Sequence, residues 1–339
     1  SATRSNSAPQ PDPSPGPGNY ATPPCIAVIG CGRWGRHVVR DLQELGCDVL
    51  VVDLSAKGRQ VGQQLGAVSA FEELSQCPTH QVDGVVIAAP TTLHVPLAMD
   101  ALDLGVPVFV EKPLADDVEQ ARMLVDAGGD RLFVMHKWHY HPGIEMLADL
   151  SASGRLGRVN GITSERTGPA NPSHDIDAVW LLAPHEITIG HRILGTFPDV
   201  VAGAADVVGG EAVGIEALTR WSTGAWHRWS MSVRPAGTRR RVVVHGTEAV
   251  AALDDPYSTH VALRRDGSSG TSEELVPISD EPPLLRELRA FRDHVLGGPP
   301  PPTPARDGLA VVELIAALRR DAGLPLSSTA PDKPCEVSR

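Results

Sequence analysis

A glycine-rich segment near residue 30 constrains the fold of this chain more than any other feature. An apolar run over 26–29 leads into Gly30-x-Gly32-x-x-Gly35, and apolar residues then recur at helical spacing up to Leu45. In a strand–turn–helix unit, such glycines allow a tight turn, close approach of a pyrophosphate and packing of the helix on the strand. The phosphates would lie against the N–H groups at the helix N-terminus. We therefore predict a dinucleotide-binding turn made by Gly30, Gly32, Arg33, Trp34 and Gly35.

A second apolar run supports this prediction and indicates which dinucleotide is bound. Residues 49–52 end at Asp53, which stands 23 residues after Gly30. An acidic residue at this place can bind the 2′-hydroxyl of the adenosine ribose and repel a 2′-phosphate. NAD is therefore predicted in preference to NADP; Lys57 and Arg59 nearby argue the other way, because they can pair with a 2′-phosphate. The alternative is a glycine turn in an unrelated α/β protein.

Strand and helix patterns alternate from residue 25 to about residue 140. Apolar runs predict strands over 26–29, 49–53, 82–89, 107–110 and 132–135, with a possible strand at Val68. Apolar residues at helical spacing predict helices over 57–65, 94–104 and 117–127. This alternation predicts an α/β dinucleotide-binding domain over 25–140, with a parallel sheet and helices on both faces.

The loops after these strands are the expected ligand-binding residues. Ligands of such sheets bind beyond the carboxyl ends of the strands. The loops at Gly30, Asp53, Pro90, Lys112 and His136 should therefore converge on one crevice.

Past residue 140 the pattern changes to several short strands followed by helices. Helices are predicted over 142–150, within 174–194, over 284–296 and over 309–321. Strands are predicted over 159–166, 212–221, 226–233, 241–245 and 260–263. This order predicts an α+β domain over 141–325 with an open, largely antiparallel sheet. Its last helix can pack back on the first domain. Residues 1–24, rich in Pro and Ser, and residues 326–339 are predicted to be tails, the first of them disordered.

Composition narrows the classes of partner and location. The formal net charge of −11 argues against a nucleic-acid surface. No stretch reaches about 18 consecutive apolar residues, so we expect no membrane span, and the first residues lack the apolar core of a secretory signal. The five cysteines show no metal-ligand or paired spacing, which favours reduced thiols in a cytoplasmic protein.

Five short motifs in order resemble one known family. These are the Gly30–Gly35 turn, Glu111-Lys112-Pro113, Gly154-Arg155-Leu156-Gly157, Pro184-His185-Glu186-Ile187 and Leu285-x-Glu287-Leu288-x-x-Phe291. Together they resemble the glucose-fructose oxidoreductase / inositol dehydrogenase (Gfo/Idh/MocA) family, from about residue 25 to residue 322. The resemblance implies oxidation or reduction of a carbinol of sugars, nucleotide-sugars or cyclitols. It also implies that the open sheet buries a subunit interface, which predicts a homodimer or homotetramer.

Lys112 is the first candidate for a catalytic residue. It follows a predicted strand and precedes Pro113, which holds its backbone extended. An ammonium group in the crevice can hydrogen-bond the reacting oxygen and stabilise alkoxide charge as it develops. The catalytic lysine of the family matches this position, and Glu111 beside it is expected near the cofactor. The alternative is a surface lysine that forms an ion pair with Glu111.

His185 is the second candidate. An imidazole that is neutral near pH 7 suits general acid–base work, and the resemblance places this histidine at the reacting hydroxyl. Leu181 stands where the family carries Asp, and leucine can neither move a proton nor accept a hydroxyl. Asp177 lies four residues before Leu181, one helical turn away, and is predicted to supply the carboxylate. The alternative for Asp177 is an acid at a helix start, and the alternative for His185 is a buried structural histidine.

The segment 136–142 matches the border of the family's substrate site. Lys137 and His139 stand where many members carry Asn and Arg. The predicted substrate residues are Lys137, Trp138, His139, Tyr140, Arg166 and Trp180. For Trp138 and Trp180 a place in the core is the alternative. Three histidines in this segment suggest a metal, but their spacing fits neither one helix face nor one strand face, so no metal is predicted.

The loop after the strand that ends at Ala89 completes the expected cofactor site. The resemblance places this loop at the nicotinamide side, which adds Pro90, Thr91 and His94. A helix cap or a surface position is an equal alternative for His94.

Three functions fit these observations. The first is an NAD-dependent oxidoreductase of a sugar, nucleotide-sugar or aminocyclitol. The others are a nucleotide-binding regulator without catalysis and a partner subunit of another oxidoreductase, because a fold does not determine a function. Leu181 favours the regulator, whereas Lys112 and His185 favour the enzyme. The Trp-bearing segment 221–233 is apolar enough to predict that the sheet face beneath it is covered by another subunit.

Overall fold

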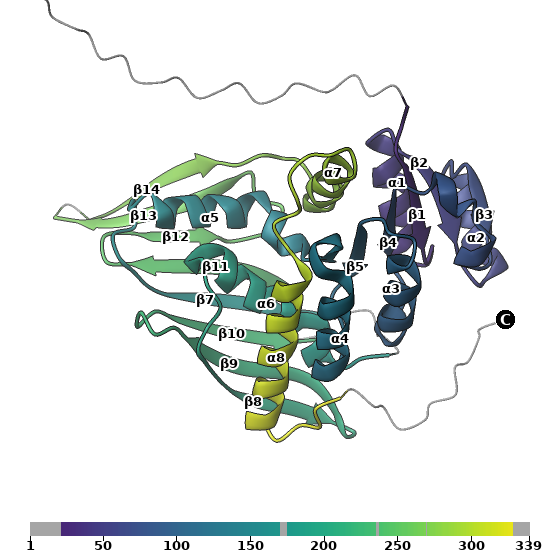
Figure 1. The fold of residues 1–339 in the computed structure, drawn as a ribbon. Helices are drawn as coiled ribbons and strands as arrows, with labels where there is room; N and C mark the ends of the chain where they lie inside the picture. Colours follow the sequence, from purple (N-terminus) through teal and green to yellow (C-terminus); the bar gives the residue numbers. More distant parts are fainter. Residues whose placement is uncertain (1–21, 170–174, 235–236, 269, 328–339) are drawn as a thin grey trace, which may run out of the picture.

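A six-stranded parallel sheet forms the first domain (Figure 1). In this computed structural model, the described residues are 22–169, 175–234, 237–268 and 270–327. The strands are β1 (Cys25–Ile29), β2 (Asp48–Val52), β3 (Ser69–Phe71), β4 (Gly84–Ile87), β5 (Val108–Glu111) and β6 (Leu132–Met135). Their order, β3-β2-β1-β4-β5-β6, puts the glycine turn after β1 at the centre of the sheet.

Helices cover both faces of this sheet because its central strands are apolar on both sides. Ile26 and Val28 of β1 pack in a cluster with α1 (Gly35–Glu44) and α7 (Pro283–Val295). Ala27 and Ile29 pack with the other face's helices, α3 (His94–Leu102), α4 (Val118–Gly128) and α8 (Ala305–Asp321). A short helix, α2 (Ala56–Gln64), follows β2. The period of two along a strand assigns alternate residues to opposite faces.

The second domain is built on an eight-stranded sheet. Its strands are β7 (Val159–Thr167), β8 (Val200–Val208), β9 (Glu211–Arg220), β10 (Trp226–Ser232), β11 (Arg239–Gly246), β12 (Val250–Leu253), β13 (His260–Gly267) and β14 (Gly270–Pro277). Their order is β14-β13-β12-β11-β7-β10-β9-β8, and every neighbouring pair is antiparallel except β7 with β10. These two sheets confirm the predicted fold class.

Helices lie on one face of the second sheet and leave the other open. The helices α5 (Pro142–Ala152), α6 (Ala178–Leu194) and α8 lie on the same side in Figure 1. Trp229 and Met231 of β10 belong to the core beneath α6. The side chains of the opposite face lack such a cover within the described part of the chain.

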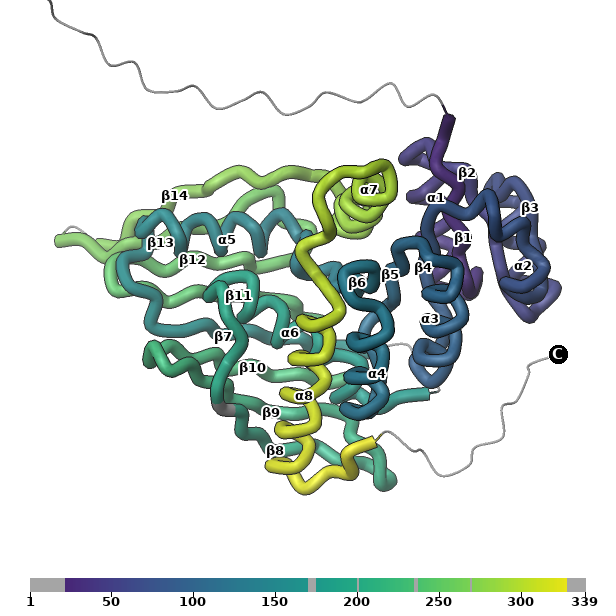
Figure 2. The backbone as a smooth tube through the Cα atoms, viewed as in Figure 1, coloured from purple at the N-terminus to yellow at the C-terminus, as the bar shows by residue number. Residues whose placement is uncertain are grey.

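The last two helices return to the first domain, as the tube in Figure 2 shows. The segment before α8 joins the edge of the first sheet, because the Val134 N–H donates a hydrogen bond to the Thr303 carbonyl at 2.9 Å. The added Cβ of an alanine at Gly308 would meet a Val134 methyl at 2.6 Å, so α8 packs very closely on β6. The second domain is therefore anchored on both faces of the first.

Two further sequence expectations concern cysteines and membranes. Cys25, Cys31, Cys47 and Cys77 are unpaired, and Cys335 lies outside the described residues. None of the helices in the described ranges is both long and apolar enough to cross a membrane. The predicted tails, 1–24 and 326–339, lie almost entirely outside the described residues.

Candidate active site

The three glycines of the turn have different surroundings. Gly30 has a φ of +91°, and an added Cβ would lie 2.7 Å from the Ala88 carbonyl oxygen. An added Cβ on Gly35 would overlap the Gly30 carbonyl. At Gly32, by contrast, none of the described atoms lies within 4 Å of an added Cβ. Gly30 and Gly35 thus allow internal packing, whereas Gly32 faces open space that a ligand can enter.

The start of α1 lies at this open space. None of the described side chains caps the helix at Trp34. Uncapped N–H groups at a helix N-terminus bind anions through hydrogen bonds and the helix dipole. The turn therefore fits a pyrophosphate.

A cleft of about 1080 Å³ continues from the turn past the ends of β2 and β4. At its rim, one carboxylate oxygen of Asp53 accepts the Cys31 N–H at 2.7 Å, and the other accepts the Ser55 N–H at 2.8 Å. These bonds hold the carboxylate between the glycine turn and α2. Arg59 is held nearby, because its Nη1 donates to the carbonyls of Asp53 and Leu54 at 2.8 and 2.9 Å. The cleft fits the adenosine half of a dinucleotide.

A second pocket of about 320 Å³ adjoins this cleft and shares Ala88, Ala89 and Pro90 with it. Most of its lining consists of side chains that the sequence predicted. These are Trp34, Pro90, Thr91, His94, Glu111, Lys112, Lys137 and His185. Met135, Asp175, Ile176 and Leu181 line it as well. The pocket therefore lies where the first domain meets the segment that leads into α6.

Lys112 is held at the wall of this pocket by contacts with both domains. Its Nζ donates a hydrogen bond to the Leu181 carbonyl of α6 at 3.0 Å, and its N–H donates to the Glu111 carboxylate at 2.9 Å. The Lys112–Pro113 peptide is cis. Burial lowers the pKa of Lys112, and the Glu111 carboxylate opposes that shift.

His185 comes from the second turn of α6 and lines the same pocket. Its Nδ1 is buried and has no hydrogen-bond partner among the described residues. Burial and then the nearby charge of Lys112 hold its pKa well below the usual range. The imidazole is therefore neutral near pH 7 and can accept a proton or a hydrogen bond.

His94 clamps two loops at the pocket. It is buried at the start of α3, with Nδ1 2.8 Å from the Pro113 carbonyl and Nε2 3.0 Å from the Ala89 carbonyl. The imidazole thus joins the loop after β4 to the loop after β5. The two alternatives stated for His94, a helix cap and a surface position, are therefore wrong.

Most of the predicted substrate residues lie behind the pocket and do not line it. Trp138 is buried, with its indole stacked on His141 at 4.8 Å and the Arg166 guanidinium 4.2 Å from its ring centre. Arg166 in turn binds Glu186 of α6 at 2.5 Å. Tyr140 is buried with its hydroxyl 3.3 Å from that of Thr303. Of the segment 137–140, Lys137 alone is in the pocket lining, and these neighbours support it from behind.

The same region contains two further histidines of the predicted segment. His139 lies near His191, with ring centres 6.3 Å apart, and burial lowers its pKa to about 3. His136 is buried with both ring nitrogens unpartnered among the residues that the structure describes, and burial lowers its pKa to about 3. His141 caps α5. Across the described ranges, no cluster of three or more His, Cys, Asp or Glu is arranged to hold a metal.

Two sequence predictions need correction. Trp180 was predicted to contact substrate, but its side chain is 0% exposed and packs in the core beneath the second sheet. Asp177 was predicted to replace the carboxylate missing at Leu181. Its carboxylate instead caps α6, accepting the N–H groups of Val179 and Trp180, and binds Arg319 of α8 at 2.7 Å. The alternative stated for Asp177, an acid at a helix start, describes it correctly.

The sequence reasoning did not identify Asp175 as a pocket residue. Asp175 lies two positions before Asp177 and lines the pocket, and its carboxylate accepts the Thr91 N–H at 2.5 Å. The same argument that selected an acid near Leu181 could have included it. Spacing alone does not show which of the two side chains faces the pocket.

Behind Lys137 lies a buried carboxylic acid. Glu287 of α7 is 0% exposed, and neither of its carboxylate oxygens has a partner in the described part of the chain. Burial, with the neighbouring Glu111 adding to it, raises the pKa of Glu287 well above its usual range. Burial therefore favours the neutral form of the Glu287 carboxyl group.

Comparisons with known proteins agree with this geometry. Residues 25–131 match the model of an oxidoreductase family with an NAD-binding Rossmann fold. The chain is 33% identical over 139 residues to a myo-inositol dehydrogenase of Streptomyces leeuwenhoekii, a match that covers 40% of this chain and 43% of that protein. It therefore spans less than half of the length of that relative.

Other relatives match over most of their length. A UDP-N-acetylglucosamine 3-dehydrogenase of Acidithiobacillus ferrooxidans is 27% identical over 282 residues, 79% of this chain and 87% of that one. A solved structure of that dehydrogenase superposes with a TM-score of 0.77 at 22% identity and covers 88% of this chain and 97% of the other. A levoglucosan dehydrogenase in complex with NADH and levoglucosan superposes with a TM-score of 0.78 at 17% identity, over 89% and 98% of the two chains. These superpositions show a shared fold.

The different surroundings of Gly32 and Gly35 generate a prediction. Gly35→Ala should destabilise the protein by about 1–3 kcal/mol, because the methyl overlaps the Gly30 carbonyl. Gly32→Ala should leave the free energy of unfolding within about 0.5 kcal/mol but weaken NAD binding by at least about tenfold, because the methyl enters the space of the pyrophosphate. Urea unfolding and calorimetric titration with NAD measure both. Equal NAD affinity in Gly32→Ala and wild type would contradict the site.

The buried Glu287 generates a prediction of pH dependence. Because its pKa is raised in the folded state, its contribution to stability is full below the unfolded pKa of about 4.3 and is lost as pH rises toward the folded pKa. Glu287→Gln should therefore become more stable relative to wild type as pH rises from about 5 to 8, by up to about 1.4 kcal/mol per pH unit. Urea unfolding at several pH values measures the difference.

Glu281→Gln is the matched control, because the Arg289 guanidinium lowers the pKa of Glu281. That variant should not gain stability relative to wild type over the same pH range. A Glu287→Gln protein whose stability difference is constant with pH would show that Glu287 is ionised in the fold.

Proposed function

This chain belongs to the Gfo/Idh/MocA family of NAD-binding oxidoreductases, and we propose that it transfers a hydride between NAD and a carbinol or ketone of a sugar, nucleotide-sugar or aminocyclitol. One observation carries the proposal: Lys112 and His185 line one pocket that adjoins the dinucleotide cleft. NAD bound in that cleft supplies the hydride acceptor or donor.

The residues of the pocket supply hydrogen bonds and proton transfer. The Lys112 ammonium has three donors, one of which binds the Leu181 carbonyl. Another donor can bind the carbinol oxygen and stabilise its negative charge as the hydride leaves. The neutral imidazole of His185 can take the hydroxyl proton in oxidation and return it in reduction. The small volume of about 320 Å³ would exclude bulk water around these groups once substrate enters.

Leu181 does not favour the regulator in this geometry. Its side chain has no acid–base chemistry, but its backbone carbonyl orients the Lys112 ammonium. A chain that had lost catalysis would have no need to hold this lysine in a pocket with a neutral histidine. The names of the relatives, an inositol dehydrogenase and a UDP-N-acetylglucosamine 3-dehydrogenase, support a polyhydroxylated substrate.

The surroundings of Asp53 support NAD over NADP. The carboxylate faces the cleft where the adenosine ribose would lie. Arg59 is one of the two cations that argue for NADP. Its guanidinium donates hydrogen bonds to two backbone carbonyls and lies 3.9 Å from the Glu72 carboxylate. The unpaired thiols also suit a reducing compartment, which supports a cytoplasmic location.

Substitution of the two pocket residues tests the mechanism. Lys112→Met and His185→Ala should each lower kcat by about 10²–10⁴-fold, because each removes a positioned donor or base. NAD affinity should change by less than about threefold if both act mainly on the reacting oxygen. Asp126→Asn, at an exposed position of α4 that lines neither pocket, serves as the control. Lys112→Met with nearly normal turnover would eliminate this mechanism.

A homodimer through the open face of the second sheet is the second part of the proposal. Trp221 and Trp229 add no exposed apolar area to this face, because they are 5% and 0% exposed. Trp226 does face outward and stacks on His245, with ring centres 5.7 Å apart. Of these three tryptophans, Trp226 alone can contribute to a contact through the open face, which corrects the prediction made from the segment 221–233.

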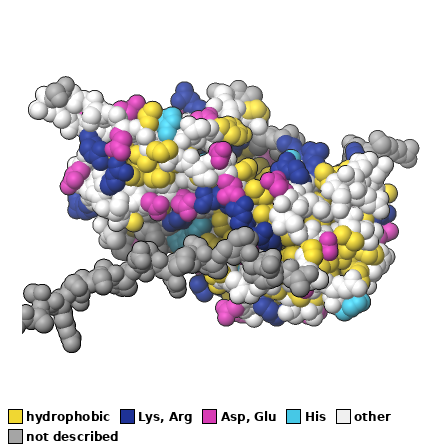
Figure 3. All heavy atoms as spheres, turned by 90° about the horizontal axis from the view of Figure 1, so that it is seen from above, with side chains coloured by type: hydrophobic (Ala, Val, Ile, Leu, Met, Phe, Trp, Pro, Cys, Tyr) yellow, Lys and Arg dark blue, Asp and Glu magenta, His cyan; other side chains and the backbone are white. Residues whose placement is uncertain are grey.

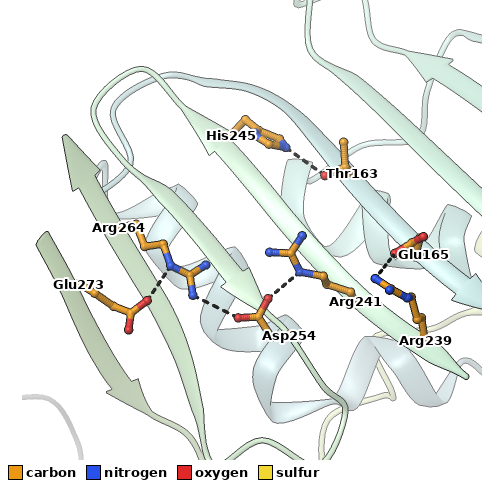
Figure 4. Close-up of polar contacts among 8 residues, drawn as sticks. All are labelled: Thr163, Glu165, Arg239, Arg241, His245, Asp254, Arg264 and Glu273. Atoms are coloured by element: carbon orange, nitrogen blue, oxygen red, sulfur yellow. Dashed lines mark hydrogen bonds and ion pairs between the residues drawn. The ribbon is translucent and has the colours of Figure 1, made fainter. Parts of the chain in front are cut away.

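Figure 4 shows that charged side chains of alternating sign cross the open face instead. Asp254 binds both Arg241 at 2.6 Å and Arg264 at 3.3 Å, and Arg264 also binds Glu273 at 2.6 Å. Seen from above, acidic and basic side chains again stand next to each other (Figure 3). In a two-fold contact the same patch meets itself, so alternating signs can pair across it. Leu218 and Leu275, 40% and 55% exposed, add apolar area.

Light scattering tests the homodimer. Wild type should give about 72 kDa, the mass of two chains in a two-fold assembly, compared with 35.9 kDa for one. Leu218→Arg should shift the particle toward the monomer, whereas Leu54→Arg on the first domain should not. A wild-type particle of one chain at micromolar concentration would contradict the homodimer.

A further inference from the structure

We propose that Asp175 supplies the carboxylate that α6 lacks at Leu181, and that it binds a substrate hydroxyl next to the one held by Lys112. This inference rests on the proposed function. The inference adds Asp175, which lies just before α6, to a site that also contains Lys112 after β5 and His185 on α6.

The pocket lining identifies Asp175. Among the described residues of that lining, the acids are Glu111 and Asp175. Glu111 lies in the chain next to Lys112 and accepts its backbone N–H. Asp175 approaches from the other domain, on the side of Leu181 and His185. A substrate in the pocket therefore meets a second carboxylate, which comes from the segment that precedes α6.

The contact with Thr91 fixes the carboxylate in place. One oxygen of Asp175 accepts the Thr91 N–H at 2.5 Å. Thr91 lies in the turn that follows β4 and is itself buried. The hydrogen bond thus joins the nicotinamide side of the crevice to the segment before α6. A carboxylate oriented by a backbone donor loses little conformational entropy when it binds a ligand.

The charge of Asp175 also acts on Lys112. The carboxylate favours the ammonium form and opposes the lowering of the Lys112 pKa by burial. Removal of this charge should therefore lower the pKa of Lys112. Asp177 cannot have this effect through the pocket, because it is absent from the lining and its carboxylate is bound to Arg319.

The reacting groups keep their roles. The two oxygens of a carboxylate offer about four acceptor sites, so Asp175 can accept a hydrogen bond from a vicinal hydroxyl of a sugar or cyclitol while it also accepts the Thr91 N–H. It accepts a hydrogen bond and takes no proton. The proton of the reacting hydroxyl still passes to His185, and the developing charge still lies against Lys112.

The decisive comparison is between two substitutions of Asp175. An asparagine at this position keeps an oxygen that can accept the Thr91 N–H, but it removes the charge. Asp175→Asn should lower kcat/KM by about tenfold or more, with most of the loss in substrate KM, and leave NAD affinity unchanged. If Asp175 only held the two domains together, Asp175→Asn would resemble wild type and Asp175→Ala alone would be impaired. That pattern would overturn the proposal.

A rescue variant tests whether a carboxylate is what the pocket needs. Leu181 lines the same pocket, so Leu181→Asp in the Asp175→Asn background places the acid where the family carries it. The double variant should recover activity relative to Asp175→Asn. Asp126→Asn, an exposed acid on α4, is the matched control and should behave as wild type.

A measurement without substrate separates this inference from the proposed function. Competitive labelling of lysines with acetic anhydride over a pH series, read by mass spectrometry, gives the pKa of Lys112 in the full chain. Asp175→Asn should lower that pKa by about half a unit or more, and Asp126→Asn should not change it. An unchanged Lys112 pKa in Asp175→Asn would overturn the proposal even if wild type oxidised no sugar. If Asp175→Asn lowers the Lys112 pKa as expected but the wild-type protein turns over no sugar, nucleotide-sugar or cyclitol, the result counts against the proposed function alone.

Discussion

The hydrogen bond from the Lys112 Nζ to the Leu181 carbonyl, 3.0 Å long, is the contact on which the site depends. It joins the end of β5 in the first domain to α6 in the second. Because both partners line the same pocket, the pocket exists only while the two domains keep this arrangement. The return of α7 and α8 to opposite faces of the first sheet keeps them in place. The arrangement of the pocket residues therefore depends on the same contacts that hold the two domains together.

The local patterns predicted the first domain well because its signals are local. The glycine turn needs only neighbouring residues, and buried parallel strands are continuous apolar runs. The strands β8, β12 and β14 were not predicted. Most side chains of β14 are exposed and two are charged, so the strand shows no alternation of apolar and polar residues. β8 contains several alanines and a glycine, and such small residues do not distinguish a strand from a loop.

The site was predicted less completely because it depends on contacts between distant residues. Lys112 and His185 were predicted because each lies within a short sequence motif, Glu111-Lys112-Pro113 and Pro184-His185-Glu186-Ile187. Asp177 was assigned by its spacing from Leu181, and spacing does not show that Arg319 binds its carboxylate. Trp180 was listed as a substrate residue with a place in the core as the alternative, and the alternative describes it. Asp175 belongs to the pocket only through its contact with Thr91, 84 residues away in the chain. Such pairs become visible only in three dimensions.

A crystal structure of the protein with NAD tests the central claim most directly. We expect the pyrophosphate at Gly32, the adenosine ribose at Asp53, and the nicotinamide in the pocket with its reactive carbon facing Lys112 and His185. A nicotinamide ring turned away from Lys112, or a dinucleotide bound outside the cleft, would contradict it. That single result would decide whether the two pockets form one active site.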